Sequence, residues 1–125
     1  MAGLSDYLEN ELLDHVFRNA AYSPPATVYV ALYTAAPTDA GGGTEVSGGG
    51  YEREAATFGA ASGGSISNSA DVDFGTTTGA WGEVSHFGVF DALSGGNLLG
   101  WAALDSSKTV ESGDPVKFPT GDLTI

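Results

Sequence analysis

Residues 81–125, WGEVSHFGVFDALSGGNLLGWAALDSSKTVESGDPVKFPTGDLTI, decide the fold of this chain. Short apolar runs recur in this stretch between segments rich in turn-forming residues. Three such turn segments occur, at residues 91–96, 105–108 and 111–114. This spacing is typical of an antiparallel sheet. It predicts a central hairpin, with one strand over residues 84–90, a turn at Gly95 and Gly96, and a second strand over residues 98–104.

Alternation along the two hairpin strands predicts which side chains share a face. The first strand is expected to place Phe87 and Val89 on one face. The second is expected to place Leu99, Trp101 and Ala103 together. The rest of the chain is predicted to build onto this hairpin.

The strongest strand outside the hairpin is TVYVALYT, residues 27–34. Both of its faces are largely apolar, which predicts a central strand covered on both sides. Weaker strand patterns follow at residues 51–58, 65–74, 116–118 and 123–125. In the second of these segments, Val72 and Phe74 alternate with Asp71 and Asp73, as in a half-exposed strand.

These elements amount to about seven or eight short strands after one helix. Two antiparallel sheets packed face to face bury the apolar faces most simply. We therefore predict a mainly β fold, a jelly-roll-like two-sheet antiparallel β-sandwich with one N-terminal amphipathic α-helix. It is expected to form a single domain over residues 1–125.

The helix is predicted over residues 4–19, with Ser5 as its N-cap. One apolar stripe recurs every four residues, at Leu4, Leu8, Leu12 and Val16. This stripe is sufficient to dock the helix on its own sheet. Leu13 and Phe17 form a second stripe, which either broadens that contact or meets another subunit.

A long loop is predicted over residues 36–50, and it contains two glycine triplets. Loops of this length are usually functional or disordered. It lacks the Gly-Lys-Ser/Thr ending of a phosphate-binding loop, so a mobile surface loop or a contact loop is expected. The candidate subunit interface therefore comprises Leu13, Phe17, Gly41, Gly42, Gly43, Gly48, Gly49 and Gly50.

Composition excludes several classes of function. Sixteen acids against four bases give a formal net charge of -12, which argues against nucleic acid as a partner. The absence of cysteine removes disulfide and thiolate chemistry. No apolar run reaches the length of a membrane span, and no signal peptide is expected.

The sequence shows no catalytic constellation. His15 and His86 lie far apart, and neither a nucleophile elbow nor paired metal-ligand spacing occurs. Asp71 and Asp73 do not stand in a calcium-binding loop motif, so a solvated strand face explains them. We predict no enzyme, no catalytic residue, no metal ligand and no cofactor. Trp81 and Trp101 suit a core or an interface, with a sugar-binding face as the alternative.

Four segments resemble small virion proteins of tailed bacteriophages, commonly labelled phage tail fibre proteins. They are the amphipathic start LSDYLENELLDHVFRN, the strand and turn VYVALYTAAPTD, the loop GTEVSGGGYER and the hairpin segment HFGVFDALSGGNLL. The likeness extends over nearly the whole chain. These motifs are structural, and none of them carries a catalytic residue.

The resemblance implies a structural virion protein, tail fibre-type or another repeated tail component, that self-assembles and docks without catalysis. A capsid decoration protein is the first alternative, and a carbohydrate-binding receptor-recognition module is the second. The expected partners are further copies of the chain in a homo-oligomer and other phage virion proteins. A host surface glycan is possible, whereas nucleic acid and membrane insertion are not expected. The implied location is the virion, assembled in the bacterial host cytoplasm.

Overall fold

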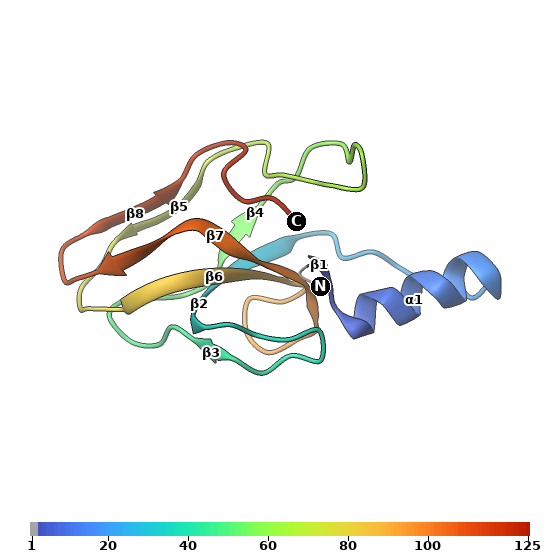
Figure 1. Ribbon diagram of the computed structural model, residues 1–125, viewed down its shortest axis with the longest axis horizontal. Helices are drawn as coiled ribbons and strands as arrows, with labels where there is room; N and C mark the ends of the chain where they lie inside the picture. Colours follow the sequence, from blue (N-terminus) through green and yellow to red (C-terminus); the bar gives the residue numbers. More distant parts are fainter. Residues whose placement is uncertain (1–2) are drawn as a thin grey trace.

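The computed structural model describes residues 3–125, so residues 1 and 2 of the predicted domain lie outside the described part. Within this range the chain forms one helix, α1 (Asp6–Phe17), and eight strands. The strands are β1 (Gly3–Leu4), β2 (Val28–Ala35), β3 (Thr44–Glu45), β4 (Glu54–Ala56), β5 (Val72–Thr76), β6 (Gly82–Phe90), β7 (Leu98–Val110) and β8 (Pro115–Phe118). The strands form a layered body, and α1 projects from one end of it (Figure 1). That the whole chain is one domain stays a prediction.

Two antiparallel sheets make up the body. The larger has the order β1-β7-β6-β2-β3, with β4 also paired to β2, and the smaller contains β5 and β8. Apolar side chains from both sheets meet in one core, including Leu32 and Phe87 from the larger sheet and Val72 and Phe118 from the smaller. The predicted mainly β, sandwich-like fold with one helix near the N-terminus is confirmed, although the two sheets are unequal in size.

Strand β2 occupies the centre of the larger sheet, as its two apolar faces predict. It pairs with β6 on one side and with β3 and β4 on the other. Val30 and Leu32 face the main core. Ala31 and Tyr33 belong to a second group, which we call the outer cluster: Ala31, Tyr33, Phe90 and Leu98. Because side chains alternate along a strand, the outer cluster lies on the opposite face of the sheet.

The predicted hairpin is confirmed as β6 and β7, but β7 is longer than expected. The turn predicted at residues 105–108 is wrong, because β7 continues through it to Val110. Val84 pairs with Lys108 whereas His86 pairs with Ala103, so residues 104–107 form a bulge opposite Ser85. The residues that resemble a turn, Asp105 to Ser107, are exposed on this bulge. Bulges accommodate extra residues without ending the strand.

The predicted shared face of Leu99, Trp101 and Ala103 is also wrong. The ladder between β6 and β7 shifts register between Val89 and Phe90, which makes Leu99 an extra residue. Leu99 therefore packs in the main core, while Trp101 packs against the outer cluster. A slip of one residue sends every following side chain to the other face of a sheet.

The weaker strand predictions are only partly confirmed. The strand predicted at residues 51–58 is reduced to β4, and the one at residues 65–74 begins at Val72 as β5. Asp71 and Asp73 are exposed while Val72 is buried, as the alternation predicts. The C-terminus ends in isolated bridge pairing and not in a strand: Ile125 and Ile66 exchange backbone hydrogen bonds of 2.9 and 3.0 Å. Leu123 is nonetheless fully buried.

Helix α1 is shorter than predicted, because Leu4 pairs with Gly100 in the sheet and not within the helix. Ser5 is the N-cap, as expected: its hydroxyl oxygen accepts a hydrogen bond of 3.1 Å from the Leu8 N–H. Asn19 ends the helix in the left-handed conformation, with φ of 55°, which asparagine tolerates better than most residues. No helix in residues 3–125 combines the length and the apolar character that crossing a membrane requires.

Candidate interaction surfaces

The base of α1 is fixed rigidly to the body. Ser5 is buried, its N–H donates to the Leu99 carbonyl at 2.9 Å, and its hydroxyl donates to the Leu98 carbonyl. The Asp6 N–H donates to the Asp39 carbonyl at 2.8 Å. From this base the helix points away from both sheets, and the chain returns through residues 18–27 to β2 (Figure 1). We call this projection, residues 6–27, the arm.

The arm carries apolar side chains that the chain itself leaves uncovered. Leu13 is 54% exposed, Val16 is 68% exposed and Phe17 is 78% exposed. Their spacing of three and four residues places them on one side of the helix. No residue of α1 is buried. The expectation that the stripe ending at Val16 docks on the sheet is therefore wrong for this half of the helix, since among residues 3–125 nothing covers it.

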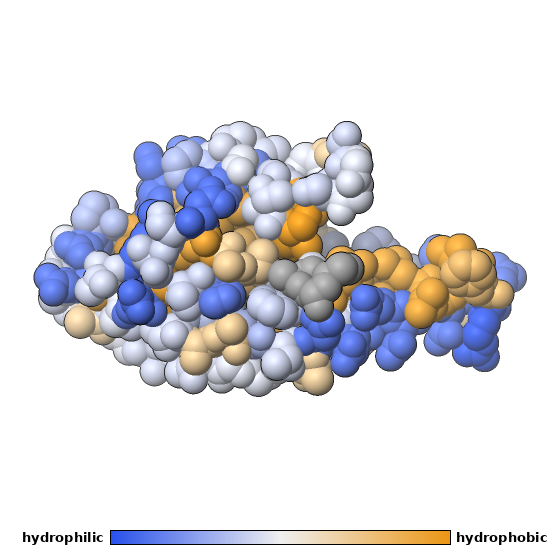
Figure 2. Space-filling view, viewed as in Figure 1, coloured by the Kyte–Doolittle hydropathy of each residue, from blue (hydrophilic) through white to orange (hydrophobic). Residues whose placement is uncertain are grey.

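The helix also carries four acids, Asp6, Glu9, Glu11 and Asp14. Glu11 lies on the side opposite Leu13, whereas Glu9 lies one turn before Leu13 on the same side, closer to the body. Figure 2 shows the apolar residues along one edge of the arm and the hydrophilic residues along the opposite edge. An amphipathic helix in a folded protein typically packs its apolar face against another apolar surface.

An apolar groove lies at the base of the arm. Its volume is about 640 Å³, and it is lined by sixteen residues, among which Asp71 is the one ionisable side chain. Six of them define its shape: Val28, Ala56 and Val89 from the larger sheet, Leu8 from the arm, Phe58 from the loop after β4, and Ile125 at the C-terminus. In Figure 2 a notch with apolar residues inside it opens between the arm and an overhanging lobe of the body.

The loop of residues 36–50 is more structured than a mobile loop would be. Strand β3 lies within it, between the two glycine triplets, and Val46 is buried. A side chain at Gly43 would come within 2.7 Å of the Pro37 nitrogen, and one at Gly49 within 2.6 Å of the Gly79 carbonyl oxygen. The chain's own packing thus accounts for these two glycines.

The other interface glycines leave more room. A side chain at Gly41, Gly42 or Gly48 would meet open space, and one at Gly50 would come within 3.0 Å of the Thr78 hydroxyl. The arrangement brings Leu13 and Phe17 together on the arm but does not bring the two triplets to them as one patch. The interface role of all eight residues stays a prediction.

A buried arginine, which the sequence analysis did not single out, holds this loop in place. Arg53 is only 8% exposed and makes a two-pronged ion pair with Glu45, with distances of 3.0 and 2.9 Å. The same guanidinium donates to the Ala92 and Gly95 carbonyls at 3.0 and 2.8 Å. It also stacks 3.6 Å from the centre of the Phe90 ring. Arg53 therefore links β3 to the turn between β6 and β7.

Tyr51 completes this arrangement, which we call the arginine clasp: Glu45, Tyr51 and Arg53. The Tyr51 hydroxyl donates to Glu45 at 2.6 Å and accepts from the Leu32 N–H at 3.0 Å. Burial acts to raise the pKa of Glu45, but hydrogen bonds from Arg53 and Tyr51 outweigh burial and hold this pKa below its ordinary value. Burial, with the Glu45 charge, raises the pKa of Tyr51. All three residues lie in the segment GTEVSGGGYER, and a rare arginine in a strongly acidic chain was the available signal.

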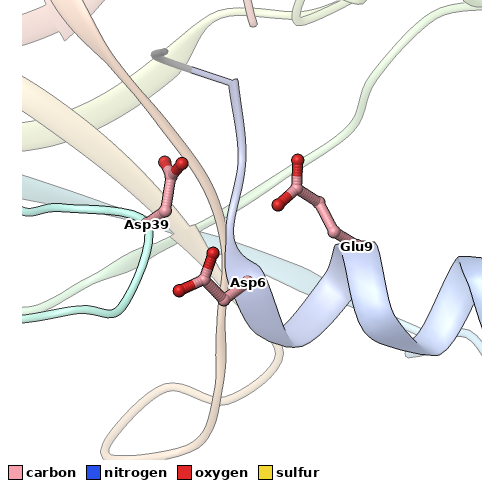
Figure 3. Close-up of side chains that lie close together, drawn as sticks. All are labelled: Asp6, Glu9 and Asp39. Atoms are coloured by element: carbon pink, nitrogen blue, oxygen red, sulfur yellow. The ribbon is translucent and has the colours of Figure 1, made fainter.

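Three carboxylates gather where the arm meets the body (Figure 3). Oxygen atoms of Asp6, Glu9 and Asp39 lie within 4.8 Å of one another. Asp6 and Glu9 occupy the first turn of α1, where the helix dipole favours negative charge. Asp39 accepts a hydrogen bond of 2.9 Å from the Trp101 indole N–H. These contacts explain the three acids structurally, and the cluster alone does not indicate a cation site.

Three further residues considered in the sequence analysis, Trp81, Asp71 and Asp73, interact with other residues of the chain. Trp81 is buried and donates its indole N–H to the Gly49 carbonyl at 2.9 Å, so it does not line a sugar-binding face. Asp71 lies 3.7 Å from the Lys117 amine, and Asp73 accepts a hydrogen bond of 2.8 Å from the Gly75 N–H. They interact with neighbours on the exposed strand face.

The fold is thus a small sandwich with a projecting arm and an apolar groove, and these features are compatible with a structural protein. The family described as Podophage GP4 fiber I protein gp80 matches residues 3–125. The chain belongs to this family, which is a family of bacteriophage fibre proteins, and the resemblance to phage tail fibre proteins is confirmed. A comparison with curated proteins finds no match.

Proposed function

We propose that this chain is a structural subunit of a podophage fibre that works by self-association and by docking on other virion proteins, without catalysis. The observation that carries the proposal is the uncovered apolar face of the arm, formed by Leu13, Val16 and Phe17. Membership of a phage fibre family supports the virion role and favours a fibre over the capsid decoration alternative.

Leaving this face in water has a substantial cost. An aromatic side chain offers about 200 Å² of surface, so Phe17 alone exposes on the order of 150 Å². At about 25 cal/mol per Å², covering it contributes about 4 kcal/mol. Many identical subunits can realise this gain together, because repetition of one contact builds symmetric assemblies. Assembly is proposed to take place in the bacterial host cytoplasm, before the fibre joins the virion.

The test is the mass of the purified protein by light scattering. Wild-type protein is expected to form a defined oligomer. Changing Leu13→Ser and Phe17→Ser together is expected to reduce the mass, with little change in melting temperature, because neither side chain is buried in the subunit. The matched control is Leu93→Ser, which removes a leucine of similar exposure, 49%, on the turn after β6. A monomeric wild type, or an equal loss of mass in the control, contradicts the proposal.

Recognition of a host surface glycan is a second candidate function, and one observation favours it. Trp101 and Asp39 line a shallow hollow together with Asp6 and Thr38. Aromatic rings beside carboxylates suit sugar binding, since the ring packs on apolar C–H groups and the acids accept hydroxyl hydrogen bonds. A glycan array separates this candidate from assembly: Trp101→Ala is expected to abolish binding while Leu93→Ser leaves it intact.

A further inference from the structure

We infer that the apolar groove of one copy receives the arm of a second copy, with Phe17 inserted near β4. The inference rests on the proposed self-association and specifies its contact. Two surfaces of this chain remain apolar and uncovered by the rest of residues 3–125: the groove and the outer half of the arm. They meet at Leu8, which belongs to α1 and also lines the groove.

Length argues against the simplest alternative, a bundle of parallel arms. A coiled coil requires apolar heptads sustained over about three or four repeats. Helix α1 has twelve residues, fewer than two heptads. An amphipathic helix of this length instead suits insertion into a groove, where anchors spaced by three and four residues fill apolar pockets. Leu13, Val16 and Phe17 have that spacing.

The distribution of charge also argues against a bundle of parallel arms. Each arm carries Asp6, Glu9, Glu11 and Asp14 on its helix. Parallel arms side by side would bring these like charges together around a common axis, which is unfavourable. The groove presents a single ionisable residue, Asp71, whose charge is offset by Lys117 at 3.7 Å. An arm in the groove can bury Leu13, Val16 and Phe17 at its outer end, while Asp6 and Glu9 stay at its base beside Asp39.

The area also favours exchange between copies. A specific interface buries about 800 Å² on each partner. Phe17, the most exposed of the three anchors, offers on the order of 150 Å², so three anchors offer at most about 450 Å² and one arm falls short. Each copy has both an arm and a groove, and each can therefore contribute twice. Reciprocal exchange between two copies and exchange around a closed ring both satisfy this arrangement.

The rigid base of the arm makes the geometry testable. Because Ser5 and Asp6 are hydrogen-bonded to the body, the arm cannot fold back into the groove of its own subunit without breaking these contacts. Helix α1 is about 18 Å long at 1.5 Å per residue. Groove insertion therefore places Phe17 of one copy near the groove of another, whereas parallel bundling brings the Phe17 positions of all copies together.

The chain has no cysteine, so engineered cysteines report these distances without background. Copies with Arg18→Cys, an exposed position next to Phe17 that leaves the anchor intact, are mixed with copies that carry Ala55→Cys, an exposed residue on β4 that lines the groove. The two carry different affinity tags, and a short bis-maleimide joins nearby thiols. The matched control replaces Ala55→Cys with Ala80→Cys, an exposed alanine just before β6 at the opposite end of the larger sheet.

The expected result is a cross-linked pair that carries both tags with Ala55→Cys, at a yield at least fivefold above that with Ala80→Cys. Predominant Arg18→Cys to Arg18→Cys products would overturn the inference in favour of bundled arms. Equal yields with the two alanine positions would overturn it as well. Light scattering on the same mixtures tests self-association separately from groove insertion. An oligomer without the expected cross-link contradicts groove insertion but not self-association, whereas a monomer contradicts both.

Discussion

The arginine clasp and the arm differ in whether their side chains find partners within one subunit. In the clasp, a buried cation meets a carboxylate, two carbonyl groups and an aromatic face, all from its own chain. In the arm, three large apolar side chains stay more than half exposed within residues 3–125. The clasp is therefore complete in a single subunit. Under the proposed self-association, the apolar face of the arm is covered only when another copy binds it.

Removing the clasp is expected to have the largest effect on stability. Arg53→Ala leaves the Glu45 carboxylate partly buried without its cation, a change that costs about 3–5 kcal/mol. The measurement is urea unfolding, with Arg18→Ala as the control, because Arg18 makes an exposed ion pair with Asp14 on the arm. A loss below about 1 kcal/mol for Arg53→Ala would show that the clasp does not hold the body together.

The loop of residues 36–50 extends this comparison. Each of its glycines can be required either by packing within the subunit or by contact with a neighbouring subunit. Gly49→Ala is expected to cost about 3 kcal/mol, from about 1–2 kcal/mol for the left-handed backbone and about 1–3 kcal/mol for overpacking against Gly79. Gly48→Ala shares the positive φ but has open space, so only the backbone cost is expected. Equal losses in urea unfolding would show that the close approach to Gly79 is unimportant.

Acid is expected to weaken the clasp through protonation of Glu45. The pKa of Glu45 is lower in the folded protein than its ordinary value of 4.5. Its contribution to stability is therefore present above about pH 4.5 and is lost as the pH falls through the lower, folded-state pKa. Melting temperatures from pH 7 to pH 3 are expected to fall less steeply in Glu45→Gln than in wild type. Glu83→Gln, which removes an exposed carboxylate on β6, serves as the control, and parallel curves for all three proteins would contradict this assignment.

Local sequence patterns predict the body well. The two apolar faces of TVYVALYT predict the central strand β2, and the glycine turn at residues 95–96 predicts the β6–β7 hairpin. The same patterns miss the bulge at residues 104–107, because exposed polar residues in a strand resemble a turn. They also miss the register shift that separates Leu99 from Trp101, since a shift depends on pairing between strands.

The candidate surfaces are predicted less completely. Helical periodicity identifies Leu13 and Phe17 as a second stripe, but periodicity does not specify whether the chain covers it. Whether the chain covers this stripe depends on the direction of α1. That direction is set by the contacts of Ser5 with β7, more than ninety residues away. The clasp likewise joins Arg53 to the turn near Gly95, a contact between distant segments that no local pattern carries.

The central claim is that the body is complete in one subunit and the arm is complete only in an assembly. Hydrogen–deuterium exchange across a dilution series tests both halves at once. An isolated helix of twelve residues is marginal in water, so amides of α1 around Leu13 to Phe17 are expected to be protected at high concentration and to exchange rapidly on dilution. Amides of β2 around Leu32 are expected to stay protected throughout. Protection of the α1 amides that does not change between oligomer and monomer would contradict the claim.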